Sequence, residues 1–435
     1  MATAYRSAFV YCLEDPSKVS PDQAMVYEPD GLLVVEEGKI IASGKVETLL
    51  PTLPAGTEVI TFADALIMPG FIDTHIHYPQ MDVIASYGEQ LLDWLEHYTF
   101  PAEGKFADAG HCQQIAESFL DELMANGTTT ALVFGTVHPQ SVDAFFTAAE
   151  ARGLRMIAGK VLMDRHAPDF LRDTPEQGDK DSRELIKRWH NRGRLSYAVT
   201  PRFAPTSSDE QLTLAGKLLE EFPDVYLHTH LAENLDEVRW VSELFPAASG
   251  YLDVYDRFAL LRPRAVFAHG IHLDQAEFRR LAETGSAIAF CPTSNLFLGS
   301  GLFNLRGAKE EGVEVGLATD VGGGTSFSLL QTLNEGYKVQ QLRGDKLHPY
   351  EAFYLATLGG ARALHLQDRI GSLAAGHEAD FVVLDARGTR LMSQRMAKAA
   401  SLEEQLFVYM MLGDDRAIRA TYANGQSQYQ REVCS

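Results

Sequence analysis

The sequence predicts an α/β protein built on a (β/α)₈ TIM barrel, with a small β-sandwich domain formed by both termini. Eight short apolar, β-branched runs alternate with helix-like segments, which is the pattern of a parallel sheet. They extend over residues 66–366, close to the length of about 250 residues that is typical of this barrel. The flanking segments alternate apolar and polar residues around glycine turns, as antiparallel strands do.

The predicted barrel strands follow one another along the chain at residues 66–72, 129–135, 155–162, 196–203, 225–230, 265–270, 286–292 and 314–320. The antiparallel pattern appears in GLLVVEEGKIIASG near residue 31 and in EADFVVLDAR near residue 378. We therefore expect a barrel over residues 66–366, inserted into a composite sandwich domain of residues 1–65 and 367–435.

Composition excludes several classes of partner. The chain has 38 Lys and Arg against 59 Asp and Glu, and its net charge of −21 repels nucleic acids and anionic membrane surfaces. No basic leader followed by an apolar run and no uninterrupted apolar stretch of about 18 residues is present. Cys12, Cys112, Cys291 and Cys434 lack the spacing of a thiolate zinc site or a disulfide framework. These features favour a soluble, cytoplasmic protein.

Two histidines, His75 and His77, stand in GFIDTHIHYPQ where the first barrel strand is expected to end. Residues two apart in a strand point to the same face, so the two imidazoles converge while Ile76 turns the other way. An isolated pair of this kind is as often structural as functional.

Similar groups close other predicted strands. His228 and His230 end the fifth strand, His269 ends the sixth, and Asp320 ends the eighth. Barrel enzymes build their active sites at the carboxyl ends of the strands, so these residues are expected to meet in space. Three imidazole nitrogens and one carboxylate suit Zn²⁺ or Fe²⁺ with an activated water.

The fifth strand leaves two points open. His228 and His230 share one face, so alternation alone does not choose between them as ligand. Glu233, three residues past His230, could exchange protons with a metal-activated water as a general acid/base. A carboxylate at the start of a helix is the structural alternative for Glu233.

Several motifs resemble the amidohydrolase family: the opening PGFIDTHIH, the segment HTHLAEN, the strand-six histidine and the strand-eight TD. Longer blocks are similar to members of that family that deaminate guanine. These blocks are PGFIDTHIHYPQ, YGEQLLDWL, NGTTTALVFGTVHPQS, TPRFAPTSS, HTHLAEN, CPTSNLFLGSGLFNL and TDVGGGTSFS. The resemblance implies hydrolysis of guanine to xanthine and ammonia, in a homodimeric enzyme.

The resemblance also implies roles for individual residues. One divalent metal, Zn²⁺ or else Fe²⁺, would be held by His75, His77, His230 and Asp320. Glu233 would shuttle protons, His269 would orient the nucleophilic water, and Asp320 would accept a proton from that water. The substrate would contact Gln80, Arg202 and Phe203 together with His230, Glu233 and Asp320. Attack is expected at C6 of the purine.

Alternatives remain for several of these residues. Arg202 could be a structural salt-bridge partner and Phe203 a core aromatic. The run Gly322–Gly324 could suggest a phosphate loop, but no Lys-Ser or Lys-Thr follows it. Cys291 is expected to be a buried thiol rather than a nucleophile, because no base accompanies it.

The expected metal number and substrate have their own alternatives. Dinuclear relatives use a carboxylated lysine at the end of strand four, where this chain reads YAVTPRF, and Lys160 lies in the preceding strand, so one metal is expected. The enzyme could act on another ring, such as cytosine, a pterin or a triazine. A catalytically inactive barrel that serves as a scaffold is a further alternative.

Overall fold

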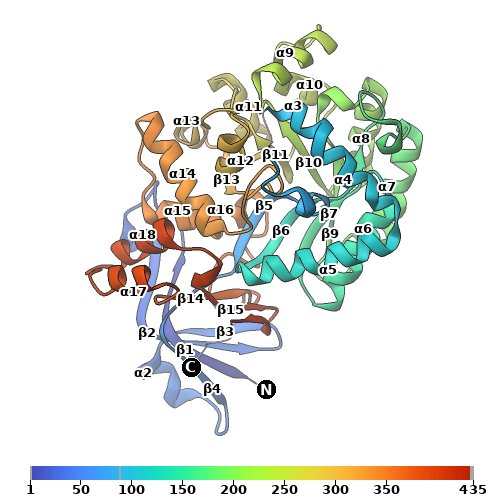
Figure 1. Cartoon of the computed structure of the whole chain (residues 1–435). Helices are drawn as coiled ribbons and strands as arrows, with labels where there is room; N and C mark the ends of the chain where they lie inside the picture. The colour runs from blue at the N-terminus through green and yellow to red at the C-terminus, as the bar shows by residue number, and fades with distance from the viewer. Residues whose placement is uncertain (1, 88–89, 432–435) are drawn as a thin grey trace.

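The computed structural model describes residues 2–87 and 90–431, which form a barrel and a separate sheet (Figure 1). Cys434 lies outside the described residues, as do Gly88 and Glu89 of the YGEQLLDWL block. The barrel strands are parallel and are paired in the order β5, β6, β7, β9, β10, β11, β12, β13, with the short β8 paired to β9. Their bounds are β5 Phe71–His77, β6 Thr128–Phe134, β7 Arg155–Gly159, β8 Val161–Leu162, β9 Ser196–Pro201, β10 Tyr226–Leu231, β11 Ala265–His269, β12 Ala287–Phe290 and β13 Glu314–Leu317.

The barrel is nearly closed between its first and last strands. The Asp320 amide donates to the His75 carbonyl at 3.0 Å, and the His77 amide donates to the Val321 carbonyl at 2.8 Å. The Thr74 hydroxyl donates to the Leu317 carbonyl at 3.0 Å. Two candidate site residues, His75 and Asp320, therefore lie directly at the closing seam.

Helices surround the barrel and bury their apolar faces against the strands, as the alternating pattern predicts (Figure 1). Side-chain caps define several helix starts, including Ser208 before α8 and Asp274 before α11. The outer helices are α5 Ala109–Ala125, α6 Pro139–Ala151, α7 Pro175–Trp189, α8 Asp209–Glu221, α9 Leu235–Leu244, α10 Tyr251–Arg257, α11 Gln275–Thr284, α12 Pro292–Phe297, α13 Leu305–Glu310, α14 Leu329–Arg343, α15 Pro349–Ala356 and α16 Leu358–Ala363. None of the helices within the described residues is long and apolar enough to cross a membrane.

The first predicted barrel strand, at residues 66–72, is wrong in its bounds. The apolar stretch there belongs to two strands: β4, Glu58–Pro69, lies in the terminal sheet, and β5 begins the barrel at Phe71. Gly70 separates them, and a Cβ at this position would overlap the side chain of Thr129. One continuous apolar run therefore contributes to two strands in different sheets, and hydrophobicity alone does not show where the first strand ends.

The two ends of the chain form one seven-stranded mixed sheet, in the order β16, β15, β14, β4, β1, β2, β3. β4 pairs in parallel with β1 and antiparallel with β14, so it joins the amino-terminal strands to the carboxyl-terminal ones. The barrel with a separate sheet from both termini confirms the predicted fold class. The remaining elements here are β1 Thr3–Cys12, α1 Pro21–Ala24, β2 Met25–Glu36, β3 Lys39–Lys45, α2 Val46–Leu49, β14 Phe381–Asp385, α17 Arg390–Met396, α18 Leu402–Leu412, β15 Ile418–Ala423 and β16 Gln426–Gln430.

A buried charge cluster joins the terminal sheet to the amino ends of β7 and β9. The Glu378 carboxylate accepts hydrogen bonds from Arg155 at 2.9 and 2.6 Å and from Arg194 at 2.9 and 2.7 Å. Arg194 also pairs with Asp380. Burial by itself would raise the pKa of Glu378, but the two arginines outweigh it and lower this pKa to about 2. We call these four residues the base cluster.

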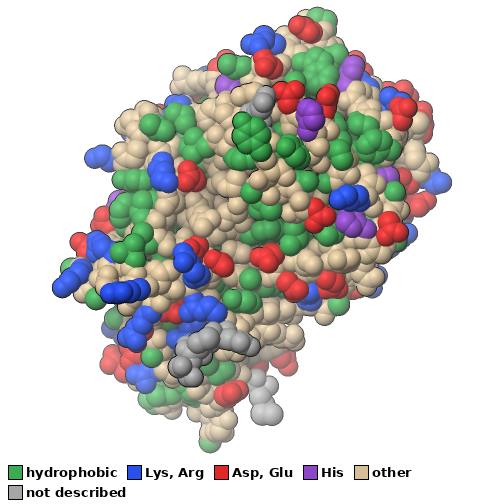
Figure 2. All heavy atoms as spheres, in the orientation of Figure 1, with side chains coloured by type: hydrophobic (Ala, Val, Ile, Leu, Met, Phe, Trp, Pro, Cys, Tyr) green, Lys and Arg blue, Asp and Glu red, His purple; other side chains and the backbone are tan. Residues whose placement is uncertain are grey.

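On the face shown in Figure 2, the acidic side chains are dispersed. Figure 2 shows Asp and Glu side chains scattered over one face of the molecule and interspersed with Lys and Arg. On this face, therefore, no single acidic patch stands out.

Candidate active site

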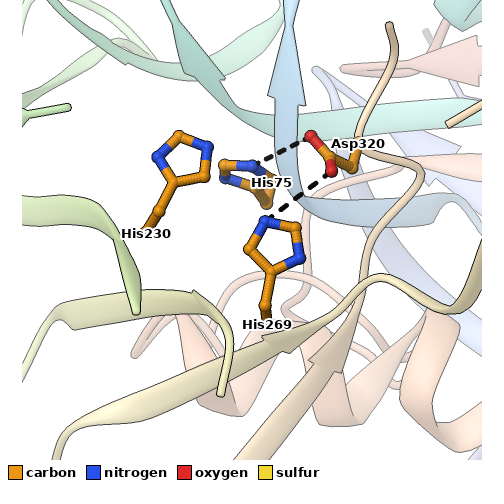
Figure 3. Close-up of side chains that lie close together, drawn as sticks. All are labelled: His75, His230, His269 and Asp320. Carbon is orange, nitrogen blue, oxygen red and sulfur yellow. Dashed lines mark ion pairs between the residues drawn. The ribbon is translucent and has the colours of Figure 1, made fainter. Parts of the chain in front are cut away.

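The predicted site residues meet at the carboxyl ends of the barrel strands. His75 and His77 end β5, His230 is near the end of β10, and His269 is the last residue of β11. Asp320 follows β13 by three residues. All five lie at one mouth of the barrel, and the close-up shows four of them facing one another (Figure 3).

Their ligand atoms are close enough to share one ion. The Nε2 atoms of His77 and His75 are 3.1 Å apart, and those of His230 and His77 are 3.2 Å apart. The Asp320 Oδ1 atom lies 3.1 Å from His75 Nε2 and 3.4 Å from His77 Nε2, and Oδ2 lies 3.7 Å from His269 Nε2. One ligand atom from each of His75, His230, His269 and Asp320 falls within 4.8 Å of all the others.

The chemistry of these groups fits a divalent cation. Burial lowers the pKa of His77 to about 3 and that of His230 well below its usual value, so both rings are neutral. His230 Nδ1 lies 2.6 Å from the Arg202 carbonyl, to which it donates as the neutral Nδ1–H tautomer, leaving the Nε2 lone pair directed into the cluster. Ligands about 2.05 Å from a tetrahedral ion are about 3.4 Å apart, close to the separations here. The cluster thus fits a single divalent metal.

The structure separates the two histidines of β10. His230 directs Nε2 into the cluster, whereas His228 lies behind His75, with its Nε2 atom 2.7 Å from His75 Nδ1. His228 is fully buried, whereas His230 is half-buried at the mouth. Alternation could not distinguish them because both point inward, at different depths in the barrel.

Glu233 lies inside the site rather than serving as a helix cap. Its Oε2 atom is 3.4 Å from His269 Nε2, and its Oε1 accepts a hydrogen bond from Ser300 at 3.3 Å. The capping role belongs to the next residue, Asn234, which caps α9 together with Glu237. Burial, and then the charge of Asp320, raise the pKa of Glu233 well above its usual value. A carboxyl group of this kind can hold and return a proton.

His269 is fixed by a residue that the sequence analysis missed. Its Nδ1 atom lies 2.9 Å from Asn295 Oδ1, at the start of the loop-side helix α12. His269, Asp320 and Ala232 all have positive φ angles, of 74°, 52° and 47°. Non-glycine residues adopt this conformation at a cost that is characteristic of functional sites.

A pocket opens beside this cluster, and its lining includes Gln80, Arg202 and Phe203, three of the predicted substrate residues. Gln80 lies in the turn η2, Tyr78–Val83, and the other two follow β9. Side chains of α3 (Leu91–Trp94) and η3 (Leu95–Thr99) also line it, and α3 and α4 (Phe100–Gly104) lie over the barrel (Figure 1). Its other lining residues are His77, His230, Glu233, Glu237, His269, Leu298, Asp320 and Gly323.

The Arg202–Phe203 pair makes structural contacts and also lines the pocket. Arg202 lines the pocket and also forms a buried ion pair with Glu103, a residue of α4 that the sequence analysis did not identify. Phe203 lines the pocket and packs with Trp94 and Leu298 in an apolar cluster. A pocket wall can be structural and ligand-facing at once.

Three further expectations have structural explanations. Lys160 is buried and pairs with Asp173. Cys291 is buried, its thiol is directed to the Ala289 carbonyl, and burial raises its pKa well above the usual value. Gly324 donates its amide to the Asp320 carbonyl at 2.5 Å, and a Cβ there would overlap the Thr319 carbonyl. The glycine run thus forms the tight turn after Asp320.

Comparisons with known proteins agree with this geometry. Residues 66–427 match the model of the amidohydrolase family. Guanine deaminase of Escherichia coli is 52% identical over 98% of both chains, and its solved structure superposes with a TM-score of 0.97 over 99% of this chain and 100% of that one. A guanine deaminase from C. acetobutylicum, solved with guanine in its active site, is 28% identical with a TM-score of 0.88, covering 99% of this chain and 100% of that one. The chain belongs to the amidohydrolase family.

Proposed function

We propose that this enzyme hydrolyses guanine to xanthine and ammonia. The observation that carries the proposal is the pairing of the buried histidine and carboxylate cluster with a pocket whose wall presents Gln80 and Arg202. Support comes also from the full-length identity of 52% to a guanine deaminase and from the relative solved with guanine bound.

In this proposal His75, His77, His230 and Asp320 hold one metal, which we take to be Zn²⁺, with Fe²⁺ as the alternative. When bound, such a cation acts as a Lewis acid and makes hydroxide available at neutral pH. Asp320 accepts the proton released at this step. His269, fixed by Asn295, orients the nucleophile through Nε2.

The carbon attacked is C2. Guanine carries its exocyclic amine at C2 and a carbonyl oxygen at C6, so the expectation of attack at C6 is wrong on chemical grounds. Glu233, whose pKa is raised by burial, donates a proton to the ring nitrogen beside C2. The proton held by Asp320 passes to the amine, which leaves as ammonia, and the hydroxyl proton on C2 returns to Glu233 as the carbonyl forms. The contacts of Glu233 with His269 and Ser300 keep its carboxyl group at the cluster.

We assign substrate recognition to the part of the pocket that lies away from the histidine and carboxylate cluster. Arg202 and Gln80 offer N–H donors, which match the acceptor atoms O6 and N7 of guanine. Phe203, Trp94 and Leu298 provide apolar contact for the purine ring. His230, Glu233 and Asp320 border the same space on the side of the cluster.

The decisive experiment measures ammonia release from guanine by the purified protein, with metal analysis of the same sample. Cytosine, a pterin and a triazine are assayed in parallel. We expect ammonia from guanine and about one equivalent of metal per chain. Release from another ring but not from guanine would replace this proposal, and no release from any ring by metal-loaded protein would support a scaffold.

Three further proposals concern organisation. We propose that the enzyme is a homodimer, that it acts in the cytoplasm in purine catabolism, and that its units are the barrel and the composite terminal domain. The first boundary, expected at residue 66, is better proposed at Gly70, because β4 continues to Pro69. Light scattering coupled to size exclusion would measure the assembly state.

A further inference from the structure

We propose that Glu103 is a positioning residue that sets the hydrogen-bonding character of the pocket wall through Arg202 and Gln80. The inference rests on the proposed action on guanine and goes beyond it, because it assigns recognition of the purine's acceptor atoms to a residue outside the pocket lining. Glu103 lies in α4, and its side chain is fully buried.

The Glu103 carboxylate binds both predicted substrate residues at once. Arg202 Nη1 donates to its two oxygens at 3.0 and 2.8 Å. Gln80 Nε2 donates to Oε1 at 3.1 Å. A buried carboxylate is stable only when it is paired and hydrogen-bonded, and these two residues satisfy that requirement. The three side chains therefore form one unit, although they come from α4, η2 and the end of β9.

This unit fixes which way the Gln80 amide faces. Its nitrogen donates to Glu103, while its oxygen accepts a hydrogen bond from the Gly322 amide at 3.2 Å. A flipped amide would place its oxygen against a carboxylate and its NH₂ against an N–H group. The second Nε2 hydrogen is thereby left for a ligand, so Gln80 presents a donor to the pocket.

Glu103 also fixes the orientation and charge of Arg202. The guanidinium has five N–H donors, of which Nη1 is engaged by Glu103, and it lies 5.4 Å from the centre of the Phe100 ring. Phe100 belongs to the same helix, α4, as Glu103. The ion pair neutralises the arginine, so the wall offers donors without net charge. Such a wall suits a neutral purine that presents O6 and N7 as acceptors.

The test measures binding without turnover. We would determine inhibition constants for hypoxanthine, for purine, which lacks O6, and for 7-deazahypoxanthine, which lacks N7. For wild-type protein we expect hypoxanthine to bind best. In Glu103→Gln, the ratio of the inhibition constant of at least one analogue to that of hypoxanthine should fall at least tenfold. The KM for guanine should rise by a larger factor than kcat falls, and metal content should be unchanged.

Two variants keep the test interpretable. Glu103→Asp keeps the charge on a shorter side chain, so we expect it to lose part of the preference for hypoxanthine over the analogues. If Glu103→Gln does not fold, Glu103→Asp is scored in its place. Glu378→Gln removes a buried carboxylate from an arginine pair in the base cluster and should leave both affinity ratios unchanged. The inference is overturned if the ratios of the scored Glu103 variant stay within twofold of wild type, or if Glu378→Gln shifts them equally. Absence of guanine turnover in the wild type would instead overturn the proposed function.

Discussion

The two ends of the barrel use buried charge in opposite ways. In the base cluster, at the amino ends of the strands, Glu378 is paired with both Arg155 and Arg194, and Asp380 with Arg194. At the mouth, His269 Nε2 has no hydrogen bond among the described residues and faces only the carboxylates of Glu233 at 3.4 Å and Asp320 at 3.7 Å.

The difference distinguishes stability from function. A buried polar group without a partner costs free energy, and at the mouth a bound ion or substrate can satisfy it. We therefore expect changes in the histidine and carboxylate cluster to abolish chemistry with little effect on stability, and changes in the base cluster to do the reverse.

Removal of the metal should have the largest effect. We expect a chelator to reduce guanine turnover to background, because the nucleophile depends on the cation. Turnover should return on addition of Zn²⁺ or Fe²⁺, and far-ultraviolet circular dichroism should stay unchanged throughout. Full activity in protein that mass spectrometry shows to be metal-free would contradict the assignment of a metal-dependent reaction to the mouth.

Glu233→Gln should come next. A general acid/base contributes about 10²- to 10⁴-fold, so we expect kcat to fall by that factor while metal content and thermal stability remain. Steady-state ammonia release measures kcat, elemental analysis measures metal content, and thermal denaturation measures stability. Near-normal turnover in this variant would remove Glu233 from the proton-transfer role.

Arg202→Ala should have a smaller effect on catalysis, mainly on binding, and should also lower the free energy of unfolding because it leaves the buried Glu103 carboxylate without its arginine partner. Loss of a charge-assisted hydrogen bond of about 1.5–3 kcal/mol corresponds to an increase in KM for guanine of about 10- to 100-fold. Arg202→Lys keeps the charge beside Glu103 but lacks the planar fork, so its increase should be smaller. If both variants keep the wild-type KM, Arg202 does not contact the substrate.

Glu378→Gln should leave kinetics unchanged and reduce stability. Breaking a buried ion pair lowers the free energy of unfolding by about 3 kcal/mol, measurable by urea denaturation at pH 7. The pKa of Glu378 is lowered from 4.5 to about 2, so its contribution is present above pH 4.5 and is lost as the pH falls toward 2. The gap between wild type and variant should therefore narrow on acidification, and a gap that widened would contradict the assignment.

The mouth was more predictable from sequence than its surroundings. Strand alternation and the rule that barrel sites lie at carboxyl ends place His75, His77, His269 and Asp320 together without coordinates. Strand alternation gives the face on which a side chain lies but not its depth along the barrel. The sequence therefore could not decide whether His228 or His230 is the ligand. The strand at residues 66–72 was misplaced because one apolar run crosses from β4 into β5.

Glu103 and Asn295 carried no recognisable signal. Glu103 stands in a helix over the pocket, where a charged residue ordinarily indicates a solvated face. Asn295 follows a strand end but belongs to no ligand pattern. Both act through another side chain, Arg202 or His269, and such contacts arise only when distant segments pack together.

The central place of β4 in the terminal sheet has a consequence during synthesis. Its partner β1 is made before it, but β14 leaves the ribosome only after the whole barrel has been translated. Until then β4 offers an unpaired edge, and such edges recruit strands from other chains. The edge of β4 in the nascent polypeptide thus stays open to such pairing until β14 occupies it.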